Sequence, residues 1–261
     1  MIKILTGHSA VGGSTIALAN LCNLFNENNL PCEFYGPHSW VKTKLETDCY
    51  KPIRSFLPNK DDVIIYHFVG LKKKPLCKKL ILSCHETSIF PVKNQKFYDS
   101  VHYVSNYQMN WHKIPGVVIP NVIKKYKALP KRTENKVAGI IGSIDPNKRV
   151  DLSIQRALKN SLVSKVEIWG KVTNDMYFLE KVCPLLGERV SYHGISEDMQ
   201  KVYDRLDIVY SSSISECLPT VQAECYLAGI EFYGIPQSSR NLDDYIFDDQ
   251  EILKKWKELL S

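Results

Sequence analysis

Short apolar runs alternate with helix-like stretches from one end of this chain to the other, and that alternation limits the possible folds more than any other feature. Strands that are separated by helices pair in parallel, so the pattern predicts parallel sheets covered by helices. In the first half we expect strands at Ile2–Thr6, Cys32–Tyr35, Val63–Phe68, Leu80–Cys84, Val101–Ser105 and Val117–Ile119, and a helix from about Ser14 to Asn28. In the second half we expect strands at Val137–Ile141, Val166–Trp169, Val190–His193, Ile208–Tyr210 and Glu231–Tyr233, and helices near 148–159, 174–185, 197–205 and 219–228.

The two halves are separated by a lysine-rich stretch. Residues 123–136 contain Pro130 and have no apolar periodicity, so we interpret them as a linker. We therefore expect an α/β protein of two Rossmann-like lobes, whose parallel sheets face a central cleft with the carboxyl ends of their strands. The expected parts are a first lobe at 1–122, the linker at 123–136, a second lobe at 137–245 and a C-terminal helix within 246–261. The helix is amphipathic, and we expect its apolar face to pack onto a lobe.

The net charge of +6 is unevenly distributed. Residues 1–135 carry 19 Lys and Arg against 9 Asp and Glu, whereas residues 136–261 carry 15 against 19. Such a basic lobe either presents a solvated face or attracts a polyanion, which would be a nucleic acid, such as DNA, or an anionic membrane surface.

The sequence also bears on the compartment. No stretch approaches the roughly 18 consecutive apolar residues of a membrane span, and the N-terminus does not have the pattern of a signal peptide. The eight cysteines form no CxxC pair, which favours a reducing compartment without disulfides or structural zinc. We expect a cytoplasmic protein with no transmembrane segment, in the host cytoplasm if the source is viral.

The most informative stretch for chemistry is 207–229. Pro219 fits the first turn of a helix, which places Glu216 in the loop before that helix and Glu224 about two turns later. The amides at such a helix start suit a diphosphate. Two glutamates alone are more often surface residues, so the interpretation depends on their context.

In that context the stretch resembles the E-x7-E signature of the retaining glycosyltransferases of family 4, which have the two-lobed GT-B fold. The resemblance covers Asp207, the serine-rich turn, Glu216, Pro219, Glu224 and Ala228-Gly229. It implies that Glu216 contacts the sugar of a nucleotide-sugar donor and that Glu224 holds the ribose hydroxyls. Cys225 stands where members of the family often have Ala.

Other segments extend the resemblance along the chain. Residues 137–152 resemble the strand, loop and helix that open the donor lobe, with Lys148 present but Ser143 in place of the usual Arg, for which Arg149 is a candidate substitute. The glycine-rich turn at 7–15 resembles the family's glycine loop and lacks the Gly-Lys-Ser/Thr ending of a P-loop.

Two histidines follow strands of the first half. Residues 82–87 resemble the strand end whose histidine contacts the transferred sugar, which implies this role for His85 and leaves His67 as a second candidate. Lone histidines in such places are more often core residues. Val122 stands where the family commonly has Gly in the turn before the linker.

The resemblance implies transfer of a sugar from a nucleoside diphosphate donor, a UDP- or GDP-sugar, to a hydroxyl with retention of configuration. The expected catalytic residues are Glu216, His85 and Lys148, and the expected donor-binding residues are Gly12, Gly13, Ser14, Ser143, Lys148, Glu216, Leu218, Pro219, Thr220 and Glu224. Lys148 would neutralise the departing diphosphate. We expect no cofactor and no metal, because no isolated Asp-x-Asp occurs.

Several alternatives remain open at this point. The basic first lobe makes an anionic acceptor plausible, such as hydroxymethylated phage DNA or a lipid-linked glycan. The chain could also be a non-catalytic nucleotide-sugar binder or a sugar-nucleotide epimerase of the same fold.

Overall fold

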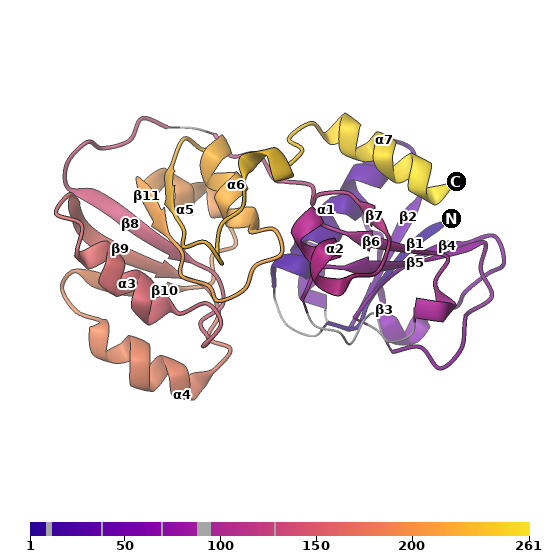
Figure 1. Cartoon of the computed structure of the whole chain (residues 1–261), viewed down its shortest axis with the longest axis horizontal. Coiled ribbons are helices and arrows are strands. Elements are labelled where there is room, and N and C mark those ends of the chain that lie inside the picture. The colour runs from indigo at the N-terminus through magenta and orange to yellow at the C-terminus, as the bar shows by residue number, and fades with distance from the viewer. Residues whose placement is uncertain (9–11, 38, 69, 88–94, 128) are drawn as a thin grey trace. The chain divides into compact units, whose positions relative to one another are not determined.

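The computed structural model describes all residues except 9–11, 38, 69, 88–94 and 128. The chain divides into two compact units, of which the first comprises Met1–Ile123 and Asp243–Ser261 and the second comprises Lys124–Leu242 (Figure 1). The first unit is therefore completed by the C-terminal end of the chain.

The first unit contains a seven-stranded sheet in the order β3-β2-β1-β4-β5-β6-β7, and its strand pairs are parallel. The strands are β1 (Ile2–Thr6), β2 (Cys32–Gly36), β3 (Tyr50–Pro52), β4 (Val63–His67), β5 (Lys79–Cys84), β6 (Ser100–Tyr103) and β7 (Val117–Val118). The central strands β1 and β4 are buried along their whole length, as expected of a parallel sheet that is covered on both faces.

Successive residues of these strands contribute to two different clusters, because side chains alternate between the faces of a sheet. Ile4 and Ile65 pack with α1 (Gly13–Glu27) and α7 (Asp249–Leu260) on one face. Tyr66 packs on the other face, with side chains from the loops around it. The described part of this unit also contains α2 (Asn106–His112) and 3-10 turns at Ser39–Lys44, Ile53–Ser55 and Gln95–Phe97. A further 3-10 turn, Leu242–Asp244, lies where the chain passes from the second unit back to the first.

The second unit contains a five-stranded sheet in the order β10-β9-β8-β11-β12, also with parallel pairs. Its strands are β8 (Lys136–Ile141), β9 (Val163–Trp169), β10 (Val190–Gly194), β11 (Ile208–Tyr210) and β12 (Glu231–Tyr233). Its helices are α3 (Val150–Leu158), α4 (Asp175–Tyr177), α5 (Met199–Arg205) and α6 (Thr220–Leu227). The predicted fold class, two parallel sheets with helices, is confirmed.

The expected single helix at 174–185 is wrong. Only α4 is α-helical there, and it is followed by a π-helical turn at Phe178–Val182 and a 3-10 turn at Cys183–Leu185. Pro184 has no amide hydrogen for a helical bond, which explains why a regular helix does not continue to 185. The start of α3 also differs from expectation, because Arg149 has a left-handed φ of 49° and the helix begins at Val150.

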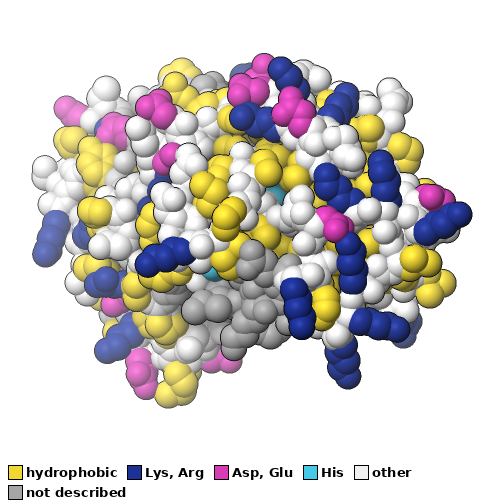
Figure 2. All heavy atoms as spheres, turned by 45° about the vertical axis from the view of Figure 1, so that its right-hand side comes forward, with side chains coloured by type: hydrophobic (Ala, Val, Ile, Leu, Met, Phe, Trp, Pro, Cys, Tyr) yellow, Lys and Arg dark blue, Asp and Glu magenta, His cyan; other side chains and the backbone are white. Residues whose placement is uncertain are grey.

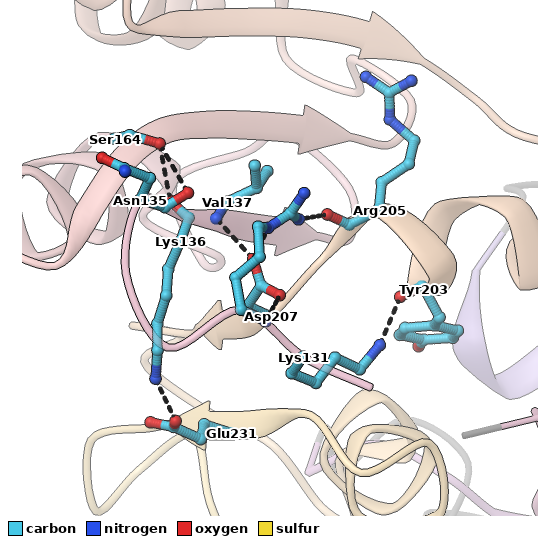
Figure 3. Close-up of polar contacts among 10 residues, drawn as sticks. Lys131, Asn135, Lys136, Val137, Ser164, Tyr203, Arg205, Asp207 and Glu231 are labelled. Carbon is cyan, nitrogen blue, oxygen red and sulfur yellow. Dashed lines mark hydrogen bonds and ion pairs between the residues drawn. The ribbon is translucent and has the colours of Figure 1, made fainter. Parts of the chain in front are cut away.

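Residues 124–127 and 129–136 of the stretch that we expected to be a linker belong to the second unit. The Asp207 carboxylate, labelled in Figure 3, accepts hydrogen bonds from the Arg132 amide at 2.8 Å and the Arg132 Nε at 2.7 Å. Lys131 Nζ donates to the Tyr203 carbonyl at 3.1 Å. Lys136, the last residue of the expected linker, is the first residue of β8. Polar contacts therefore fix this lysine-rich segment although it has no apolar periodicity.

None of the helices described here is both long enough and apolar enough to cross a bilayer.

Candidate functional site

The loops that follow β8 and β11 lie together, because these strands are neighbours and parallel. The Ile214 amide donates to the Asn147 carbonyl at 2.8 Å and joins the two loops. The ammonium of Lys148 forms an ion pair with Oε1 of Glu216. These side chains keep 28% and 16% of their surface exposed, so a solute can still reach both charges.

Asp145 organises the first of these loops. Its carboxylate accepts hydrogen bonds from the amides of Asn147 and Lys148, both at 2.9 Å, and from the Ser143 hydroxyl at 2.6 Å. The Ser143 hydroxyl hydrogen is thus used inside the loop, and binding of the nucleotide-sugar by Ser143 stays a prediction. Ser143 can still act as an acceptor.

Two glycines allow the strand ends beneath this loop to approach closely. Gly142 and Gly170 have φ values of +146° and +151°, and a Cβ on Gly170 would lie 1.7 Å from the Gly142 carbonyl oxygen. Any side chain at Gly170 would therefore push apart the ends of β8 and β9, on which the Lys148 loop is built.

The start of α6 follows the Glu216 loop. Leu218 and Pro219 are both buried. Pro219 is the residue before the helix rather than part of its first turn, so Thr220 is the first helical residue. Proline has no side-chain acceptor to cap the first turn. The expected donor-binding residues at 218–220 therefore lie at the N-terminus of α6, with only Thr220 inside the helix, and Leu218 and Pro219 have little exposed side-chain surface.

Glu224 lies on the side of α6 that faces α5. It is half-buried, and its Oε2 accepts a hydrogen bond from the Tyr203 hydroxyl at 2.5 Å. Desolvation raises the pKa of Glu224 to about 7, and the Tyr203 hydrogen bond and the charge of Lys124 oppose this shift. Glu216 and Glu224 thus have different partners in the second unit, Lys148 and Tyr203.

The sequence analysis missed Arg240. The guanidinium of Arg240 donates to the Glu216 carbonyl oxygen, and its amide donates to Gln222 Oε1 at 2.8 Å. Arg240 lies after β12, which is the neighbour of β11, so the strand order brings it to the same loop. No motif in residues 234–242 indicated this; the only signal was an arginine shortly after the last strand.

In the first unit, polar side chains gather at the carboxyl ends of β1, β4 and β5. His67 Nδ1 lies 2.8 Å from Thr6 Oγ1, and His67 Nε2 lies 3.1 Å from Glu86 Oε1. Burial alone would raise the pKa of Glu86, but hydrogen bonds from His67 and Ser14 and the electrostatic interaction with His67 lower it to about 2. Glu86 is therefore an ionised carboxylate near the start of α1.

His85 lies beside this group. Its Nε2 is 3.0 Å from Ser83 Oγ, which is also 2.8 Å from His102 Nδ1. Burial and the charge of His67 keep the pKa of His85 well below its ordinary value. His85 Nδ1 is buried and has no hydrogen-bond partner among the residues described. His85 is thus a neutral imidazole whose Nδ1 is closed off from solvent.

The glycine loop is only partly described, because residues 9–11 lie outside the described ranges. Gly12 is the N-cap of α1, and Gly13 is its first residue. A Cβ on Gly13 would meet no atom within 4 Å, which leaves room beside the backbone among the described residues. Ser14 reaches Glu86, so the structure brings the glycine loop and the residues after β5 together.

The described part of the chain contains no group of three or more His, Cys, Asp and Glu side chains that could hold a metal ion. The arrangement in the second unit can instead bind a diphosphate through Lys148, Arg240 and the start of α6, and hydroxyl groups through the two glutamates.

No family model matches the chain, and no curated protein matches its sequence. Several solved structures are similar in fold. HepE from Anabaena in complex with UDP-glucose aligns with a TM-score of 0.67 and 15% identity, over 89% of this chain and 79% of HepE. WaaG, a glycosyltransferase involved in lipopolysaccharide biosynthesis, aligns with a TM-score of 0.63 and 11% identity, over 100% of this chain and 90% of WaaG.

AviGT4, a glycosyltransferase involved in avilamycin A biosynthesis, aligns with a TM-score of 0.62 and 16% identity, over 98% of this chain and 87% of AviGT4. At such identities the likeness concerns the fold, and it extends over nearly the whole chain in each comparison. The chain has the fold of the GT-B glycosyltransferases, which consists of two Rossmann-like lobes.

Proposed function

We propose that this protein is a glycosyltransferase that transfers a sugar from a UDP- or GDP-sugar to a hydroxyl group, with the retention of configuration that the resemblance to family 4 implies. The observation that carries the proposal is the pairing of Lys148 with Glu216 at the carboxyl ends of β8 and β11. The fold supports it, since the similar structure of HepE is a complex with UDP-glucose.

The chemistry requires that the negative charge of the departing diphosphate be stabilised. Lys148 supplies a positive charge for this, and Arg240 supplies a second one beside the Glu216 loop. A bound diphosphate competes with Glu216 for the Lys148 ammonium. The Glu216 carboxylate then becomes available to accept hydrogen bonds from the hydroxyls of the donor sugar.

The other candidates have positioning roles in this proposal. Glu224 accepts hydrogen bonds from the ribose hydroxyls when it is ionised, and its pKa of about 7 makes that step pH-dependent. For His85, contact with the transferred sugar is what the resemblance to family 4 implies. The acceptor is a hydroxyl compound, and the excess of Lys and Arg in residues 1–135 favours an anionic one.

The use of the Ser143 hydroxyl hydrogen within its own loop favours a second candidate, a nucleotide-sugar binder without transferase activity. In family 4 an arginine usually stands at this position and contacts the diphosphate. Here the residue is Ser143, and its hydroxyl donates to Asp145 instead. A binder would be stabilised by nucleotide-sugars without turning them over, whereas an epimerase would convert the donor without an acceptor.

The proposal is tested in two steps. A thermal-shift panel of nucleotide-sugars first identifies the donor, because a ligand that binds only the folded state raises the apparent melting temperature. Release of nucleoside diphosphate is then measured for the wild type, Glu216→Gln and Lys148→Ala, with the exposed pair Glu180→Gln and Lys181→Ala as controls.

We expect Glu216→Gln and Lys148→Ala each to lose about 100-fold or more in turnover, with little change in stability, and the controls to match the wild type. Turnover at the wild-type rate by both site variants would rule out the assigned site.

A further inference from the structure

Two loops of the first unit lie side by side at one end of its sheet. Residues 54–61 precede β4 and residues 72–78 precede β5, so both end at the amino ends of neighbouring strands (Figure 1). Phe56 from the first loop and Cys77 from the second pack against the same apolar cluster. The Lys78 amide also donates to the Asp62 carbonyl at 2.8 Å. We call residues 54–61 and 72–78 together the double-loop surface.

Each of these loops turns one leucine outward. Leu57 is 77% exposed and Leu76 is 71% exposed, which are the highest values among the large hydrophobic side chains described. Each leucine directly follows or precedes a residue that is anchored in the apolar cluster, Phe56 or Cys77. The anchored neighbours hold the leucines away from the core, so their exposure is a fixed feature of the fold.

The rest of the double-loop surface is strongly basic. Its exposed cations are Arg54, Lys60, Lys72, Lys73, Lys74 and Lys78, and its one exposed acidic residue is Asp61. Lys74 contacts Asp99 at 2.5 Å. Figure 2 shows lysine and arginine side chains outnumbering acidic ones on this end of the first unit, with hydrophobic side chains between them. Positive charge and exposed leucines thus occur on the same surface.

This combination distinguishes between possible partners. A nucleic acid is bound through cations and stacking aromatic side chains, and exposed leucines add nothing to phosphate contacts. The interface of an anionic bilayer uses both features, since its headgroups attract lysines and its acyl boundary accepts apolar side chains. We propose that the double-loop surface docks the first unit onto an anionic phospholipid bilayer, with Leu57 and Leu76 entering the interface. The proposal does not depend on the glycosyltransferase assignment.

The test is co-sedimentation of the full chain with vesicles. We expect the protein to bind vesicles of phosphatidylglycerol and phosphatidylcholine, and not vesicles of phosphatidylcholine alone. Leu57→Ser with Leu76→Ser should weaken binding to the anionic vesicles by about tenfold or more. Lys72→Gln with Lys73→Gln and Lys78→Gln should abolish it, and added salt should weaken it.

The matched control is Leu162→Ser with Leu179→Ser, which removes two leucines of the second unit that are 46% and 59% exposed. This control should bind vesicles like the wild type. A far-ultraviolet circular dichroism spectrum and a melting temperature equal to those of the wild type verify that each variant is folded.

Binding of duplex DNA, measured by fluorescence anisotropy, is the competing outcome. Vesicle binding that the leucine variant retains in full would overturn the proposal. So would binding of duplex DNA that is tighter than vesicle binding and unaffected by loss of the leucines, because it would show that the cations alone define the partner.

Discussion

At the scale of single residues, Glu224 leads to a prediction about how nucleotide affinity depends on pH. Its pKa of about 7 means that the carboxyl group is largely protonated below that pH, whereas ribose hydroxyls need an ionised acceptor. Affinity for UDP or GDP should therefore fall as the pH is lowered from about 8 to about 6, and each unit below the pKa reduces the ionised fraction about tenfold. Isothermal titration calorimetry measures this directly.

The control for this prediction is Glu224→Gln, which cannot ionise. It should bind the nucleotide more weakly than the wild type at about pH 8, and its affinity should fall less than that of the wild type toward about pH 6. A wild-type affinity that stays constant over the same range would remove Glu224 from the ribose site.

The conformation of Gly170 leads to a prediction about the stability of the second unit. Its φ of +151° is rarely adopted by residues with a side chain, and a Cβ there would lie 1.7 Å from the Gly142 carbonyl oxygen. Gly170→Ala should lower the free energy of unfolding of the second unit by about 3 kcal/mol or more. Gly187→Ala is the matched control, since a Cβ at Gly187 would meet no atom within 4 Å. Equal urea midpoints for the two variants would show that the strand ends can separate at little cost.

The site residues differ in how far the sequence could predict them. Lys148 and Glu216 each follow a strand that could be recognised, and the resemblance implied a common donor site for both. Their proximity depends on the strand order, in which β8 and β11 are neighbours, and the sequence did not specify that order. Arg240 and Glu86 had no such signal, because their roles depend on contacts with a carbonyl oxygen and a histidine distant in sequence. The hydrogen bond from Ser143 to Asp145 depends on the loop conformation, which no spacing specifies.

At the scale of elements, apolar alternation predicted the long buried strands and failed for short or irregular segments. β3 is a three-residue edge strand with mostly exposed side chains, and α2 has seven residues, so neither has a period that could be recognised. The segment at 174–185 has a helical period, but its turns are irregular before and around Pro184. Periodicity reports which side chains face the core and leaves the backbone hydrogen bonds undetermined.

The strand β6 carries a buried histidine that should make the first unit sensitive to acid. Burial lowers the pKa of His102 to about 4, although a hydrogen bond to the Ile119 carbonyl opposes this shift. The unfolded chain takes up a proton near pH 6.5 and the folded chain only near pH 4. Stability should therefore be complete above about pH 6.5 and fall toward pH 4, with a slope of up to about 1.4 kcal/mol per pH unit.

Urea unfolding at a series of pH values, followed by tryptophan fluorescence, measures this slope. His102→Gln should reduce the slope without removing it, because the neighbouring His85 also has a lowered pKa and contributes with the same sign. Glu86 has a pKa of about 2, so its protonation lowers stability only at lower pH. An unchanged slope in His102→Gln would show that other groups cause the acid sensitivity.

At the scale of the whole molecule, the chain leaves the first unit at Ile123 and returns to it at Asp243. The returning segment forms α7, whose Trp256 is buried against Phe25 of α1 with ring centroids 5.8 Å apart. The ring centroids of Trp256 and His102 are 4.6 Å apart. The last helix of the sequence is thus part of the core of the unit that contains the first strand.

Because the two units have separate apolar cores, damage to α7 should weaken one unit and spare the other. Trp256→Ala should cost the first unit about 3 to 5 kcal/mol and accelerate hydrogen exchange in β1, β4 and α1, while exchange in β8, β9 and β11 stays unchanged. Lys257→Ala, at an exposed position of the same helix, should leave exchange as in the wild type. If Trp256→Ala accelerated exchange equally in both sheets, the units would unfold as one cooperative structure, and nucleotide binding to the second unit would then also protect the first.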